Sequence, residues 1–173
     1  MVSPRSFVML VQWLYLGRVL FSESTPKECI TTTIEFVRLA DFCGVTGMET
    51  QMAQKIQAII LANPAPNTSL VEQGRDPDTN TYSLIPQHIT SAFLLPNGHP
   101  VRRVLATAAV EGYLRSDKPK FLKEIREIPS FAVDLLMEIK KTLKTATASE
   151  FGVSFSFTDP LSGQTLPFVA RCP

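Results

Sequence analysis

The sequence predicts a mainly helical protein, and three observations indicate this fold class. Apolar residues make up 45% of the 173 residues and charged residues 19%, a composition that supports a buried core and excludes a wholly disordered chain. Several segments repeat apolar side chains every three or four residues, as amphipathic helices do. Proline, glycine and hydroxyl residues stand at the ends of these segments, where helices begin and stop.

The N-terminal part begins with two predicted helices. The first covers residues 6–17, an apolar segment that ends at a glycine. The second begins near Pro26, because Thr25 can cap its free amide groups and Glu28 can satisfy another amide in return. Gly44 can adopt the left-handed conformation that ends a helix, so we expect the second helix to stop there.

A third helix is predicted over residues 47–62, where methionine and isoleucine recur at helical spacing before Asn63 and Pro64 stop it. Its short connection to the preceding helix predicts that the two form an antiparallel pair. Residues 63–84 have the composition of a turn-rich linker with few core residues, and we expect this linker to be mobile.

Residues 85–146 predict a helical extension. An apolar stretch over residues 84–95 precedes a helix that starts at Pro100. The small Ala108 and Gly112 on the buried stripe of this helix would allow another helix to approach closely.

Two more predicted helices complete this extension, which makes three helices after the linker. The first covers residues 121–128 and is terminated by Pro129. The second has Ser130 as its capping residue and continues to Leu143.

The tail over residues 147–173 has the pattern of a β hairpin. Val153, Phe155 and Phe157 alternate with smaller residues, and residues 159–163 supply a turn before the next apolar residues. An isolated hairpin is marginally stable in water, so this one must dock on the helices or stay loose.

No arrangement of residues predicts catalysis, so we expect a protein that is not an enzyme and uses neither cofactor nor metal. His88 and His99 lack a cysteine or carboxylate at the spacing of zinc ligands. Gly-x-Ser-x-Gly turns and glycine-rich phosphate loops do not occur in the sequence. Cys29, Cys43 and Cys172 are too few for a disulfide scaffold, which favours a reducing compartment such as the cytoplasm or nucleus.

Charge and hydropathy argue against two classes of partner. The formal net charge of +1 lacks the basic surplus that nucleic-acid-binding proteins carry. Residues 85–146 hold more basic than acidic residues, but the two signs are interleaved, as on a solvated helical face. No apolar run reaches the roughly 18 to 20 residues of a membrane span. We therefore expect neither nucleic acid nor a membrane as the partner.

Two short motifs occur in residues 1–62. The first is Val-Gln-Trp-Leu-Tyr-Leu-Gly over residues 11–17, and the second is Leu-Ala-Asp-Phe-Cys-Gly-Val over residues 39–45. In their order, their separation and the predicted helix over residues 48–60 that follows them, these motifs resemble the C-terminal half of a BTB/POZ domain.

Residues 95–102 and 128–136 are similar to helical extensions of fungal BTB-type proteins. The resemblance implies an incomplete, BTB/POZ-like α/β segment followed by the helical extension. It also implies a non-enzymatic protein–protein interaction module that pairs with itself or with another BTB-type protein. Some members of the family are adaptors or scaffolds in cullin-type ubiquitin ligases or transcription complexes, but we assign no residue of this chain to a cullin contact.

The strands and helical hairpin that ordinarily begin such a domain do not precede these motifs in the sequence. The missing half would cover one side of the segment. We therefore expect Trp13, Tyr15, Phe36 and Met52 to contact protein partners, with either self-association or the later helices covering the exposed side.

A secreted small helical protein is the alternative. Arg5 and the apolar residues 7–17 are similar to a secretory signal, although Gln12 interrupts the apolar run and no small-residue cleavage site follows. Cleavage would leave a helical protein with Asn67 glycosylated and two cysteines paired. The large aromatic Trp13 suits a packed helix better, so an intracellular interaction module is the interpretation that we favour.

Overall fold

The computed structural model describes residues 3–65, 78–116, 118–148 and 155–168. This part of the chain is mainly helical, as predicted. Its helices are α1 (Pro4–Leu16), α2 (Pro26–Phe42), α3 (Glu49–Ala62), α4 (Pro86–Ala92), α5 (Pro100–Arg115), α6 (Leu122–Glu127) and α7 (Pro129–Leu143). Its strands are β1 (Thr147–Ala148), β2 (Phe155–Thr158) and β3 (Thr165–Pro167), which form one antiparallel sheet in the order β1-β2-β3.

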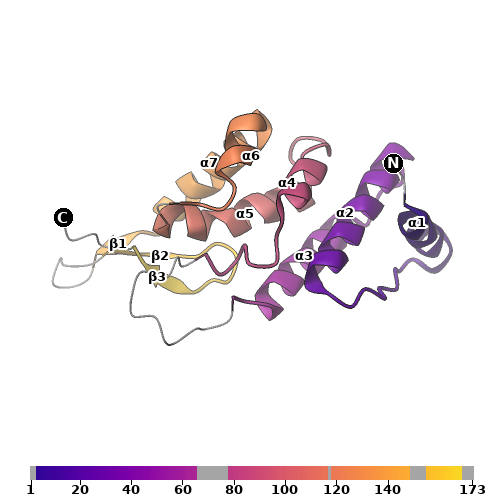
Figure 1. Cartoon of the computed structure of the whole chain (residues 1–173), viewed down its shortest axis with the longest axis horizontal. Coiled ribbons are helices and arrows are strands. Elements are labelled where there is room, and N and C mark those ends of the chain that lie inside the picture. The colour runs from indigo at the N-terminus through magenta and orange to yellow at the C-terminus, as the bar shows by residue number, and fades with distance from the viewer. Residues whose placement is uncertain (1–2, 66–77, 117, 149–154, 169–173) are drawn as a thin grey trace.

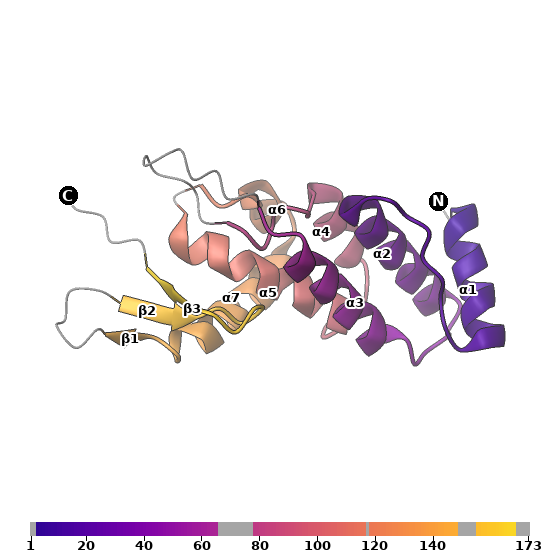
Figure 2. The same ribbon diagram turned by 90° about the horizontal axis from the view of Figure 1, so that it is seen from below.

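The elements follow one another along an elongated molecule (Figure 1). Helix α1 lies at one end and packs on α2, and α3 lies between α2 and α5. Helix α7 packs on α5, and β2 contacts α7 near the other end (Figure 2). The buried apolar side chains of the helices form one continuous core, so the N-terminal segment and the helical extension are packed together.

The ends of α2 are set by the residues that predicted them. The hydroxyl of Thr25 accepts a hydrogen bond from the Glu28 amide at 3.2 Å and donates one to the Glu28 carboxylate at 2.9 Å. Beyond the other end, Gly44 has a positive φ of 68°. Helix α3 lies beside α2, which confirms the predicted helix pair (Figure 2).

The extension differs from the prediction at two places. Helix α4 is a fourth helix, formed by part of the apolar stretch over residues 84–95. The prediction that Ser130 caps α7 is wrong, because Pro129 occupies the first turn of α7 and Ile128 is the capping residue. Proline suits the first helical position since it has no amide hydrogen to satisfy there, so Pro129 both ends α6 and begins α7.

The end of the predicted linker is a packed part of the fold. Asn80, Thr81, Ser83 and Leu84 are all buried, whereas residues 66–77 lie outside the described residues. Hydrogen bonds explain why polar side chains can be buried here: the Asn80 amide donates to Asp159 at 3.0 Å. The expectation of a loose linker is therefore wrong for residues 78–82.

The same segment explains the glycine at position 112 of α5. The carboxylate of Asp78 lies against Gly112, so a polar loop rather than another helix makes the close approach that Gly112 permits.

The predicted hairpin is present and docked on the helices. Residues 155–158 pair with residues 165–167, with Phe157 opposite Leu166, while β1 is an additional strand that the sequence pattern did not predict. Phe157 is fully buried, and the Leu161 carbonyl in the turn accepts a hydrogen bond from Gln57 of α3 at 2.9 Å. Val153 lies outside the described residues.

Candidate interaction surfaces

Helix α1 is fixed to the rest of the protein by its inner face and its N-terminus. Met9 and Leu10 are buried, and α1 packs along α2. The hydroxyl of Ser3 caps α1 and donates a hydrogen bond to Glu35 of α2 at 2.6 Å. Arg5 forms an ion pair with Glu23 at 2.9 Å. The orientation of α1 is therefore set by packing and by polar contacts together.

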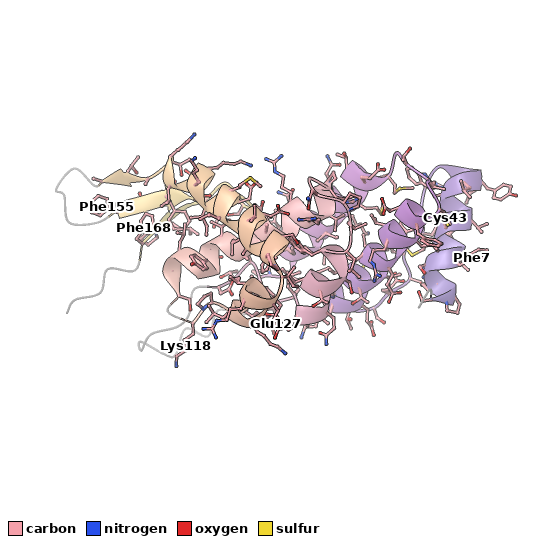
Figure 3. All side chains as sticks on the ribbon, turned by 90° about the horizontal axis from the view of Figure 1, so that it is seen from above. Phe7, Cys43, Lys118, Glu127, Phe155 and Phe168 are labelled. Atoms are coloured by element: carbon pink, nitrogen blue, oxygen red, sulfur yellow. The ribbon has the colours of Figure 1, made fainter. Side chains whose placement is uncertain are left out.

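The outer face of α1 is apolar and exposed. We define this face by five side chains that cover about 120° of the helix at 3.6 residues per turn. They are Phe7, Val8, Val11, Leu14 and Tyr15. No charged residue occurs between residues 6 and 17, and the Tyr15 hydroxyl is the only polar group among these five side chains. Figure 3 shows Phe7 projecting from α1 at the end of the molecule opposite Phe155 and Phe168.

The four predicted contact residues do not share one surface. Tyr15 is 84% exposed on the outer face of α1, and Trp13 is partly buried against the core. Phe36 and Met52 are 0% and 2% exposed, so the expectation that they contact partners is wrong. Helices α1, α3 and α4 pack on α2, and α5 packs on α3, so the later helices cover the side that was expected to be open.

A groove of about 560 Å³ lies between α5 and α7. The exposed apolar side chains of Val133 and Met137 line it from α7, together with Pro129. Charged side chains line it from both helices. These are Arg102 and Arg103 on α5 and Asp134, Glu138 and Lys141 on α7.

A buried arginine holds the two walls of this groove together. The Arg102 guanidinium, which is almost fully buried, donates to the Asp134 carboxylate of α7 at 2.9 and 3.1 Å. It also donates to the Leu95 carbonyl at 3.1 Å and to the Asn97 side chain at 2.7 Å. The Phe93 ring lies 4.5 Å from the guanidinium carbon. This network fixes the spacing of α5 and α7 at the groove.

Both histidines have structural hydrogen bonds. His99 is the capping residue of α5, where its Nδ1 accepts from the Val101 amide at 3.1 Å. His88 Nδ1 accepts from the Ile85 amide at 3.3 Å, so its proton is on Nε2, which lies 2.8 Å from the Thr31 hydroxyl. Burial lowers the pKa of His99 and lowers that of His88 to about 4. Both side chains are therefore neutral in these hydrogen bonds near pH 7.

Carboxylates gather where α5 meets residues 78–84 and the turn after β2. The Glu111 carboxylate accepts hydrogen bonds from the Arg115 guanidinium at 2.8 Å and from the backbone amide of Asn80 at 3.3 Å. Burial raises the pKa of Glu111, and the negative charge of Asp159 raises it further. The Oδ2 atom of Asp159 accepts from Asn80, whereas its buried Oδ1 atom has no hydrogen bond to any residue that the structure describes. Among the described residues, no group of three or more histidine, cysteine or carboxylate side chains is arranged to hold a metal ion.

Two further observations concern the alternative of a secreted protein. Cys29 and Cys43 carry free thiols, and Cys43 is exposed near the α1 end of the molecule (Figure 3). Asn67 and Cys172 lie outside the described residues. Within residues 3–65, 78–116, 118–148 and 155–168, no helix combines the length and the apolarity that a bilayer crossing demands.

The groove residues Val133 and Met137 were not predicted from the sequence. They are exposed on α7, whereas Phe131 and Leu135 of the same helix are buried in the core. The pattern that could have revealed the groove is the presence of apolar residues on more than one side of residues 129–143.

Comparisons of the chain with protein-family models, with curated proteins and with solved structures found no match.

Proposed function

We propose that this protein is a non-enzymatic protein–protein interaction module that pairs with a second copy of itself through the outer face of α1. The observation that supports the proposal is the uncharged apolar surface formed by Phe7, Val8, Val11, Leu14 and Tyr15. Exposed apolar patches of a few hundred Å² mark interaction sites on many proteins. The motifs similar to BTB/POZ domains, the first of which includes Val11, Leu14 and Tyr15, also support a self-associating module.

The size of the outer face fits a small dimer interface. Five large side chains, each at least one-third exposed, leave several hundred Å² of apolar surface on each copy. Two copies would then approach the roughly 1,200 Å² of total buried area at which specific interfaces begin. Burial of apolar surface contributes about 25 cal/mol per Å², less the cost of association, so we expect a dimer of modest affinity.

A second copy suits this face better than a charged partner. In a two-fold dimer the same patch meets itself, so each side chain needs only an apolar neighbour. The outer face carries no charge, and therefore two copies bring no like charges together. Contacts at Ser3 and Arg5 hold α1 in place before association, which lowers the entropy that binding must overcome.

The packing of α1 argues against removal of the first 20 or so residues as a secretory signal. Removal would take Met9 and Leu10 out of the core and would uncover the side of α2 on which α1 packs. Mass spectrometry of protein produced in its natural cells tests this point, because a chain that retains Met1 has not been cleaved.

Light scattering coupled to size exclusion tests the self-association. We expect the wild-type protein to shift from monomer to dimer as its concentration rises, and Leu14→Glu to remain monomeric. Leu94→Glu is the matched control, because Leu94 is 66% exposed, close to the 59% of Leu14, and lies outside α1. Thermal unfolding should show that both variants are folded.

Two results would overturn this proposal. The first is a wild-type protein that stays monomeric at every concentration. The second is a dimer that Leu14→Glu and Leu94→Glu affect equally. An adaptor or scaffold role in a larger complex would rest on the dimer, so it would fail with it.

A further inference from the structure

We propose that the groove between α5 and α7 binds an acidic amphipathic peptide segment of a partner protein. Helices α5 and α7, whose residues line the groove, lie on the far side of the α2 and α3 pair from α1 (Figures 1 and 2). The inference therefore does not depend on self-association. If both proposals hold, one face pairs two copies while the other recruits a partner.

Three apolar residues of α7 form a ridge along one wall of the groove, against which a peptide could pack. Pro129, Val133 and Met137 line it at intervals of four residues along α7. At a rise of 1.5 Å per residue, this ridge is about 12 Å long. An amphipathic helical segment with apolar residues at positions i, i+4 and i+7 presents anchors over about 10 Å, close to the length of this ridge. The floor is preorganised because Arg102 and Asp134 hold the two helices together.

The charges at the rim select an acidic partner. Arg103 and Lys141 are 67% and 56% exposed at the side chain, and both reach the same Glu138 oxygen, at 3.4 and 2.5 Å. The other carboxylate of the groove, Asp134, is held by Arg102. The exposed cations of Arg103 and Lys141 thus share the single carboxylate of Glu138. A carboxylate on the peptide would complete the pairing of Arg103 and Lys141.

The same charges argue against a second copy in this groove. Arg103 and Lys141 are the exposed cations that line the groove. Placing two copies of the groove face to face would bring these cations together, and like charges across an interface cost binding energy.

Selection from a peptide library tests the inference. The probe is a phage-displayed library of random 16-residue peptides, panned against the full-length protein. We expect the enriched peptides to combine aspartate or glutamate with apolar residues at i, i+4 spacing. A labelled enriched peptide is then titrated by fluorescence anisotropy against variants of the groove.

The variants are paired with controls on the same helix. Met137→Gln and Lys141→Gln should each weaken peptide binding about fivefold or more, and the effect of Lys141→Gln should shrink at high salt. Leu136→Gln and Lys140→Gln make the same chemical changes at exposed positions outside the groove, and they should bind like the wild type. Leu14→Glu should also bind normally, which separates this inference from self-association.

Several outcomes would overturn the inference. These are a library that yields no enriched peptide, enrichment of basic or uncharged peptides, and equal effects of the groove variants and their controls. Titration with dodecanoate provides another check: if it binds in a Met137-dependent manner while no peptide is enriched, the groove is a site for a small amphiphile. If Met137→Gln abolishes self-association, the occupant is a second copy.

Discussion

The carboxylate of Asp78 lies so close to Gly112 that a β-carbon at position 112 would come within 2.5 Å of Asp78 Cγ. Glycine inside a helix costs about 1 kcal/mol relative to alanine, and Gly112 sits inside α5. The glycine is there because residues 78–84 pack against that side of α5. Asp78 also accepts a hydrogen bond from the Thr81 hydroxyl at 2.5 Å, so its side chain has little freedom to move away.

Gly112→Ala should therefore lower the free energy of unfolding, by about 1–2 kcal/mol, despite its better helix propensity. The reason is that Asp78 must leave Thr81 to make room for the methyl group. In an Asp78→Ala background the same substitution should be neutral or stabilising. Urea unfolding of the four proteins of this double-mutant cycle measures the coupling, and equal effects in the two backgrounds would show that the contact is not responsible.

Arg102→Ala should lower the free energy of unfolding by about 3 kcal/mol or more. The substitution leaves Asp134 without its partner and removes the hydrogen bonds to Leu95 and Asn97. Adding Asp134→Ala should cost little more, because the two residues act as one unit. Chemical denaturation measures these changes, with the exposed Arg126→Ala as the control. A loss no larger than that of Arg126→Ala would contradict the role of this network.

His88 should make the protein less stable in mild acid. Burial lowers its pKa to about 4 in the folded protein, against an ordinary value near 6.5. Its stabilising contribution is complete above pH 6.5 and is lost as the pH falls toward 4. A pKa difference of this size corresponds to on the order of 3 kcal/mol.

As the pH rises from 4.5 to 7, the free energy of unfolding should therefore increase less for His88→Gln than for the wild type. The free energy of unfolding in urea, measured over that range, checks this expectation. Parallel curves for the two proteins would mean that His88 does not titrate differently on folding.

Glu111 should have the opposite effect. Burial raises its pKa in the folded protein above the usual 4.5, so its contribution to stability is complete below pH 4.5. That contribution is lost as the pH rises through the higher folded-state pKa. The stability of Glu111→Gln relative to the wild type should therefore increase with pH above 4.5. The exposed Glu127→Gln is the control, and the same pH profile in both variants would contradict the prediction.

Local residues predicted most of the helices. Thr25 and Pro26 marked the start of α2, and Pro100 marked the start of α5, because capping and proline geometry act within one turn. Helix α4 was not identified as a helix because seven residues are too few to display a periodic pattern. The burial of Asn80 could not be predicted, since its partner Asp159 lies 79 positions later in the chain.

The candidate surfaces were likewise predictable only where neighbouring residues in the sequence determine them. Tyr15 was predicted as a contact residue and is exposed, because one side of α1 has no other element over it. Phe36 was predicted on the same argument and is buried, since helices after the linker pack over the first segment. The groove is formed by two helices together, so neither the pattern of α5 nor that of α7 could reveal it alone.

Two hydrogen bonds between residues far apart in the sequence have a consequence for biosynthesis. The Asn80 amide is paired with Asp159, and Gln57 of α3 with the Leu161 carbonyl, across 79 and 104 positions. A ribosome makes α3 and residues 78–84 long before it reaches these partners. The nascent chain must therefore hold those groups in water until residues 159–161 have been made. A message truncated before codon 155 would produce a polypeptide in which Asn80 and Gln57 never find these partners.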